Sequence, residues 1–177
     1  KQDQPQREGS ARHQGRTPMK ILVVSDTHGR DENFEQAVMQ ETPFDMLIHC
    51  GDVEGREIFI EALTECPCHI VSGNNDFFSD LPREEIVEAG NNRIFVTHGH
   101  YYGVSMDITG VIDEAKDRGC NAVFFGHTHK PLLETIDGVL ALNPGSLTYP
   151  RQRGRRPSYA IVNLDQTGHL TAELKHL

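Results

Sequence analysis

The sequence predicts an α/β protein built as a mixed two-sheet β-sandwich flanked by helices. In the first two thirds of the chain, short apolar runs typical of buried strands alternate with segments whose apolar residues recur at helical spacing. This alternation indicates β-α-β units and a largely parallel sheet. In the last third, short strands follow one another without a long helix between them, and residues 166–168 are typical of a hairpin turn. Together the two patterns predict a mixed sandwich.

The strands are expected where apolar residues follow one another without a helical period. The first strand, residues 20–24, contains four consecutive apolar residues, three of them β-branched, which is typical of a strand buried on both faces. Further strands are predicted over residues 45–50, 68–72, 93–97, 122–125, 139–142, 159–162 and 170–174.

The helices are expected between these strands. Residues 31–41 and 54–65 each have apolar side chains at helical spacing, and each segment is followed by a proline that ends it. Residues 82–87 are typical of a short helix with proline in its first turn. A longer amphipathic helix is predicted over residues 104–118, closed by glycine.

Length and composition favour one domain. The chain has 177 residues, which is within the usual size of a single domain. Residues 1–18 are polar and have no periodic apolar face, so we expect a disordered arm or an added segment there. The domain is then expected over residues 19–177.

The charge balance and the cysteines restrict the expected partners and compartment. A net charge of −9 argues against a general affinity for nucleic acid, which requires a basic face. No apolar run is long enough to cross a bilayer and no signal peptide opens the chain, so we expect no membrane partner. The four cysteines lack disulfide-framework spacing, which favours a reduced, cytoplasmic protein.

Five of the predicted strands end in glycine together with Asp, Asn or His. The carboxyl ends of parallel strands meet at one edge of a sheet, where open α/β sheets bind ligands. Carboxylate, amide and imidazole groups without a thiolate suit Mn, Fe, Co, Ni or Zn rather than a structural zinc site. We therefore expect a metal centre formed by seven side chains: Asp26, His28, Asp52, Asn74, His98, His127 and His129.

The alternative for each of these residues is an ordinary structural role. A single histidine in a strand is usually a satisfied core residue, and a single buried aspartate is more often a cap or an ion-pair partner. Burying several such groups together costs several kcal/mol per charge unless each is paired. Few lysines or arginines accompany these strand ends, so divalent cations are the favoured partners.

Five motifs in this order resemble those of the calcineurin-like metallophosphoesterases, closest to the small uncapped bacterial and archaeal phosphodiesterases. The resemblance extends over residues 19–177, and the motifs are Asp26-x-His28, Gly51-Asp52, Gly73-Asn74, His98 and Gly126-His127-Thr128-His129.

The resemblance implies a role for each of these side chains. Three of them would hold one ion, namely Asp26, His28 and His129, and three would hold the other, namely Asn74, His98 and His127. Asp52 would bridge two divalent ions, with Mn²⁺ favoured and Ni²⁺, Co²⁺, Fe²⁺ or Zn²⁺ as alternatives. A hydroxide between the ions would attack phosphorus in a small phosphodiester. The residues expected to take part in catalysis are Asp52, Asn74, His98 and His100.

One position departs from the wider family. Many members have a histidine in the place of Asn75 that is thought to protonate the leaving group, and an amide cannot do so. Losing general acid catalysis, typically a factor of about 10²–10⁴, favours substrates with acidic leaving groups. His100 is a candidate substitute acid, and a supporting or exposed imidazole is the alternative.

Two functions follow from the resemblance. The first is a divalent-metal-dependent phosphodiesterase. The alternative is a protein-binding scaffold with little or no catalysis, as in a retromer-associated relative, and the intact set of seven ligand residues favours the enzyme. The resemblance also implies a homo-oligomer. A basic loop that contains Arg151, Arg153, Arg155 and Arg156 is left as either a solvated loop or a phosphate or protein contact.

Overall fold

The computed structural model describes residues 17–177, and the arm predicted over residues 1–18 lies outside them except for its last two residues. Two five-stranded sheets form the described fold, with strand orders β10-β9-β1-β2-β3 and β4-β5-β6-β8-β7. The first sheet contains β1 (Met19–Val24), β2 (Met46–His49), β3 (Cys68–Ile70), β9 (Ser158–Leu164) and β10 (Leu170–His176). The second contains β4 (Glu84–Ala89), β5 (Asn92–Thr97), β6 (Ala122–Phe124), β7 (Leu132–Ile136) and β8 (Val139–Asn143).

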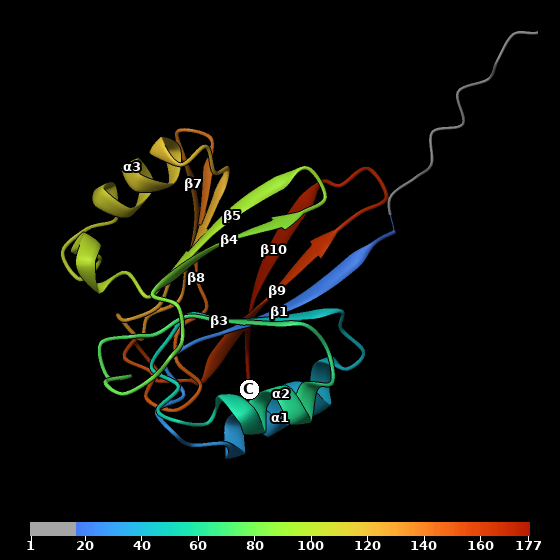
Figure 1. The fold of residues 1–177 in the computed structure, drawn as a ribbon, viewed down its shortest axis with the longest axis vertical. Helices are drawn as coiled ribbons and strands as arrows, with labels where there is room; N and C mark the ends of the chain where they lie inside the picture. Colours follow the sequence, from blue (N-terminus) through green and yellow to red (C-terminus); the bar gives the residue numbers. More distant parts are fainter. Residues whose placement is uncertain (1–16) are drawn as a thin grey trace, which may run out of the picture.

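The helices cover the outer faces of the two sheets. In Figure 1, α1 (Glu32–Glu41) and α2 (Glu57–Thr64) lie together beyond the first sheet, whereas α3 (Thr109–Asp117) lies on the far side of the second. The predicted mixed two-sheet sandwich flanked by helices is therefore confirmed.

The burial pattern of β1 explains why this strand is apolar on both faces. Ile21 and Val23 belong to the core between the sheets, together with residues of β5 and β6. Leu22 and Val24 point the other way, into the layer formed with α1 and α2. A third cluster packs α3 against the outer face of the second sheet. Because successive side chains in a strand alternate faces, only a continuous apolar run satisfies both layers.

Within each sheet, the strands that lead to the predicted ligands are parallel. β1, β2 and β3 pair in parallel, as do β5, β6 and β8. β9 and β10 add antiparallel strands at one edge of the first sheet, as the hairpin signal predicted. The five strand ends expected along one sheet edge are thus divided between two sheets that face each other.

The predicted helix over residues 82–87 is wrong. Most of this segment belongs to β4, which pairs antiparallel with β5 from Glu84 opposite Thr97 to Ala89 opposite Asn92. Val87 and Ala89 are buried at a spacing of two, which is the strand period. Pairing along six residues of β5 outweighs the weak helical signal of one proline and two glutamates.

Smaller differences concern the boundaries and one strand. The helix predicted over residues 104–118 begins only at Thr109, because residues 100–102 form a short 3-10 helix and residues 103–106 a turn. Strand β7 was not predicted. All four cysteines are free thiols. No helix within residues 17–177 is long and apolar enough to cross a membrane.

Candidate metal centre

The seven predicted ligand residues all lie just beyond the carboxyl ends of parallel strands. Asp26 and His28 follow β1, Asp52 follows β2, and Asn74 follows β3. From the facing sheet, His98 follows β5, and His127 and His129 follow β6. Strand ends that are far apart in the sequence therefore meet between the two sheets.

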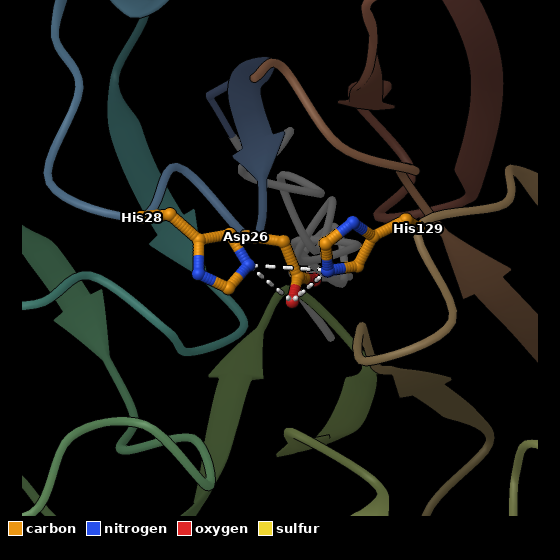
Figure 2. Close-up of side chains that lie close together, drawn as sticks. All are labelled: Asp26, His28 and His129. Carbon is orange, nitrogen blue, oxygen red and sulfur yellow. Dashed lines mark hydrogen bonds and ion pairs between the residues drawn. The ribbon is translucent and has the colours of Figure 1, made fainter. Parts of the chain in front are cut away.

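The first group of donor atoms comes from Asp26, His28 and His129 (Figure 2). Nε2 of His28 lies 3.1 Å from Nε2 of His129. Oδ1 of Asp26 lies 3.2 Å from Nε2 of His129 and 3.7 Å from Nε2 of His28. The three atoms surround one point, and their types suit a divalent transition metal.

The second group lies beside the first. Oδ1 of Asn74 is 3.0 Å from Nε2 of His98 and 3.1 Å from Nδ1 of His127. Oδ2 of Asp52 is 3.4 Å from the same His98 nitrogen and 3.8 Å from Nε2 of His28 in the first group. Asp52 therefore lies between the two groups, and so does Asp26, whose Oδ1 is 3.8 Å from Nε2 of His98.

Three of the imidazoles have their Nδ1 atoms occupied by oxygen acceptors. Nδ1 of His98 faces the Cys50 carbonyl at 2.7 Å, and Nδ1 of His129 faces the Tyr149 carbonyl at 2.7 Å. Nδ1 of His28 faces Oε1 of Glu54 at 3.1 Å. Because an oxygen accepts a hydrogen bond, it requires a proton on Nδ1. In a neutral ring, Nε2 is then unprotonated and carries a lone pair. These contacts turn three lone pairs toward the centre.

One oxygen of Asp26 shows that the centre fits a cation. Oδ2 accepts hydrogen bonds from Ser25 Oγ at 2.6 Å and from the His127 backbone N–H at 3.0 Å. Oδ1 is buried and has no hydrogen-bond partner within the described residues. It faces Nε2 of three histidines, and the neutral tautomers described above turn their lone pairs toward it. A cation satisfies all of these atoms at once.

The pKa shifts at the centre also arise from the close contacts between Asp26 and the imidazoles. Burial disfavours ionisation of Asp26, but the facing imidazoles of His129 and His28 hold the pKa of its carboxyl well below the usual range. Burial also disfavours the charged form of His28, yet Asp26 and Glu54 raise the pKa of its imidazole to about 9. The metal-free centre therefore holds a proton where the bound ion would supply positive charge.

The backbone at the centre is unusual for these residue types. Nine residues other than glycine have a positive φ in the described chain, and five of them are predicted ligands: Asp26, His28, Asp52, His127 and His129. This left-handed region is sparsely populated by such residues and is concentrated at functional sites. Sharp turns after the strands thus direct the side chains back to one point.

Two glycines allow the ligand segments to approach closely. A Cβ at Gly126 would clash with Ser25 Oγ and lie 2.6 Å from Oδ2 of Asp26. A Cβ at Gly73 would clash with Oδ1 of Asp52. Only residues without a side chain fit at these two positions.

Several residues outside the seven predicted ligands support the centre. Asp76 accepts backbone hydrogen bonds from Asp52 and Glu54, at 2.9 and 2.7 Å, and from Gly73 at 2.7 Å. It thereby fixes the turn that bears Asp52. Glu54 and Ser25 contact ligands directly, but nothing in their local sequence distinguishes them from surface residues.

His100 lies next to the second group without joining it. Its ring centroid is 5.4 Å from that of His98 and 6.0 Å from that of His127. Nδ1 of His100 is buried and has no hydrogen-bond partner among the described residues. Burial, together with the neighbouring His98 and His127, lowers the pKa of its imidazole. Its position agrees with either sequence-based interpretation of this residue.

The comparisons with known proteins place the chain in a family. Residues 19–167 match the calcineurin-like phosphoesterase superfamily domain, and the chain belongs to that superfamily. A probable metallophosphoesterase from Bacillus subtilis is 39% identical over 150 residues, which cover 83% of this chain and 85% of the relative. A phosphodiesterase from Methanocaldococcus jannaschii is 32% identical over 147 residues, which cover 72% of this chain and 83% of the relative.

Solved structures confirm the fold. A predicted phosphoesterase from Streptococcus pneumoniae superposes with a TM-score of 0.73 at 26% identity, covering 91% of this chain and 99% of that chain. Vacuolar protein sorting 29 from Cryptosporidium parvum superposes with a TM-score of 0.72 at 21% identity, covering 90% of this chain and 98% of that chain. The second similarity concerns the fold alone.

Proposed function

We propose that this protein is a divalent-metal-dependent phosphodiesterase that hydrolyses small phosphodiesters at a two-metal site. The observation that supports this most is the meeting of all seven predicted ligand side chains between the two sheets. Asp26, His28 and His129 would hold one ion, Asn74, His98 and His127 the other, and Asp52 would contact both. The phosphodiesterase from M. jannaschii supports the choice of reaction.

Residues of this chain prepare the site for that reaction. When bound, two divalent ions, with Mn²⁺ favoured, supply positive charge for the phosphate oxygens and lower the pKa of an attacking water. Glu54 and the carbonyls of Cys50 and Tyr149 hold three histidines in the tautomer that presents Nε2. The Asn75 side-chain amide donates to Oδ2 of Asp52 at 2.9 Å and so orients this carboxylate. Asn75 is therefore a positioning residue and does not act as an acid.

The cavity beside the second group suits an aryl or similarly flat leaving group. It has a volume of about 390 Å³ and is lined in part by Asn74, His100 and Tyr101. The Arg83 guanidinium lies 4.2 Å from the Tyr101 ring centroid, which makes a flat cationic and aromatic wall. A flat, acidic leaving group matches both this wall and the amide at position 75.

The scaffold alternative is less well supported. The fold is shared with vacuolar protein sorting 29, but this similarity does not distinguish binding from catalysis. The centre here keeps every predicted ligand together with the contacts that orient the imidazoles. These two features favour the enzyme over the scaffold.

The test is turnover of bis(p-nitrophenyl) phosphate before and after metal removal. We expect activity with Mn²⁺, loss after chelation, recovery when Mn²⁺ is restored, and slower turnover of the monoester p-nitrophenyl phosphate. Full activity after thorough chelation would refute the proposal. So would the absence of activity with each of Mn²⁺, Ni²⁺, Co²⁺, Fe²⁺ and Zn²⁺.

A further inference from the structure

A second cavity lies on the other side of the centre, beside the first group of ligands. It has a volume of about 760 Å³. Its lining comes from two ligand histidines and from the loop after β8, namely His28, His129, Thr148, Tyr149, Pro150, Arg151 and Arg155. Anything bound in this cavity would lie next to a phosphate held at the first group of ligands.

Backbone contacts fix the loop to a predicted metal ligand. The Nδ1–H of His129 donates to the Tyr149 carbonyl at 2.7 Å. The Arg151 backbone N–H donates to the His129 carbonyl at 3.0 Å. The backbone of Arg151 is therefore fixed in position relative to the metal centre.

Within residues 17–177, the two arginines of this cavity form no ion pair. Arg56, Arg93 and Arg118 each form an ion pair with Asp or Glu. The other six arginines of residues 17–177 are in none of the ion pairs found there, and they include Arg151 and Arg155. In a protein of net charge −9, carboxylates are abundant, so two unpaired guanidinium groups beside the site are a local concentration of positive charge.

The four arginines of the basic loop differ in position. Arg151 and Arg155 line the cavity, whereas Arg153 and Arg156 do not. Arg156 instead donates to the Leu177 carbonyl at 3.1 Å. The loop is thus divided into two arginines that line the cavity and two that do not.

We propose that this cavity is a subsite for a second phosphate group of the substrate, with Arg151 and Arg155 as its ligands. The inference rests on the proposed function and narrows its substrate class to phosphodiesters that bear a further phosphate on the group next to His28 and His129. Guanidinium groups bind phosphate through paired, charge-assisted hydrogen bonds, and such bonds contribute more than neutral ones.

The test compares two chromogenic esters that differ only in the second phosphate. They are thymidine 5′-(p-nitrophenyl phosphate) and the same compound with a 3′-phosphate. For the Mn²⁺-loaded protein we expect kcat/KM to be about tenfold or more higher for the 3′-phosphorylated ester. The ratio should fall toward one in the double variant Arg151→Gln with Arg155→Gln, and it should be unchanged in the control variant Arg153→Gln.

A binding measurement separates failure of the subsite from failure of the enzyme. Calorimetry would compare thymidine 3′,5′-bisphosphate with thymidine 5′-phosphate on the same three Mn²⁺-loaded proteins, after circular dichroism has shown that each is folded. If neither ester is turned over, the proposed function fails, and the affinity ratio of the two nucleotides still decides the subsite. Equal wild-type affinities, a ratio retained by the double variant, or an equal loss in Arg153→Gln would overturn the inference.

Discussion

Nε2 of His28 and Nε2 of His129 face each other at 3.1 Å, although the Nδ1 atom of each ring already faces an oxygen acceptor. Two neutral rings in this arrangement would place lone pair against lone pair. A proton or a cation must therefore lie between them. Asp26 and Glu54 raise the pKa of His28 to about 9 against the effect of burial, which favours a proton at this position when no metal is bound.

The first prediction concerns stability. Adding Mn²⁺ to metal-free protein should raise its thermal midpoint, because ions bind the converged donors of the folded state and not the unfolded chain. At 100 times the dissociation constant, each site adds about 2.7 kcal/mol. Differential scanning calorimetry with Mn²⁺ and with Mg²⁺ as a comparison measures the effect. An unchanged midpoint at millimolar Mn²⁺ would contradict the metal centre.

The second prediction concerns pH. Below about pH 9, metal-free His28 keeps its proton because Asp26 and Glu54 outweigh the effect of burial on its pKa. Metal binding must displace that proton, so the apparent affinity should decrease about tenfold per pH unit for each proton displaced as the pH falls. Calorimetry at pH 7.5 in buffers of different ionisation enthalpy should detect proton release. An affinity that is constant between pH 6.5 and 9 would argue against His28 as a ligand.

The third prediction compares two residues of the site. Asp52→Asn removes the carboxylate that lies between the two ligand groups, and we expect kcat to fall by about 10²–10³ or more. His100→Gln should cost less than tenfold on a p-nitrophenyl diester, whose leaving group needs no proton. If His100 is the acid, an alkyl diester should lose about 10²–10⁴ in the same variant. A larger loss for His100→Gln than for Asp52→Asn on the aryl ester would reverse the assigned roles.

The fourth prediction tests the close approach at Gly126. In Gly126→Ala, the new methyl group meets Ser25 Oγ and Oδ2 of Asp26, so overpacking should lower the free energy of unfolding by about 1–3 kcal/mol. It should also weaken metal binding, because Asp26 is displaced. Adding Ser25→Ala removes one of the two clashes and should restore part of the stability. Metal affinity should stay weak in the double variant. If the double variant bound metal as tightly as the wild type does, Asp26 would not be a ligand.

The strand ends could be predicted from the sequence because apolar runs change abruptly to Asp, Asn or His. Parallel strands then bring such residues together at their carboxyl ends, whether the strands belong to one sheet or to two facing sheets. That the five ends divide between two sheets depends on strand order, which local sequence does not specify.

The errors have equally specific causes. Residues 82–87 resemble the start of a helix locally, and only pairing with β5 makes residues 84–89 a strand. Strand β7 was missed because three of its five residues are exposed, so it lacks a clear apolar run. Glu54 supports the centre through a contact with His28 across two distant turns, which no local pattern reveals. Local sequence also does not reveal that Arg151 lines the cavity beside His28 and His129 whereas Arg153 does not.

Anomalous diffraction from crystals of the Mn²⁺-loaded protein tests the central claim most directly. We expect two peaks at the manganese edge, one beside Asp26, His28 and His129 and the other beside Asn74, His98 and His127. Asp52 should contact both. Peaks located elsewhere, or no peak at this centre at saturating Mn²⁺, would contradict the account.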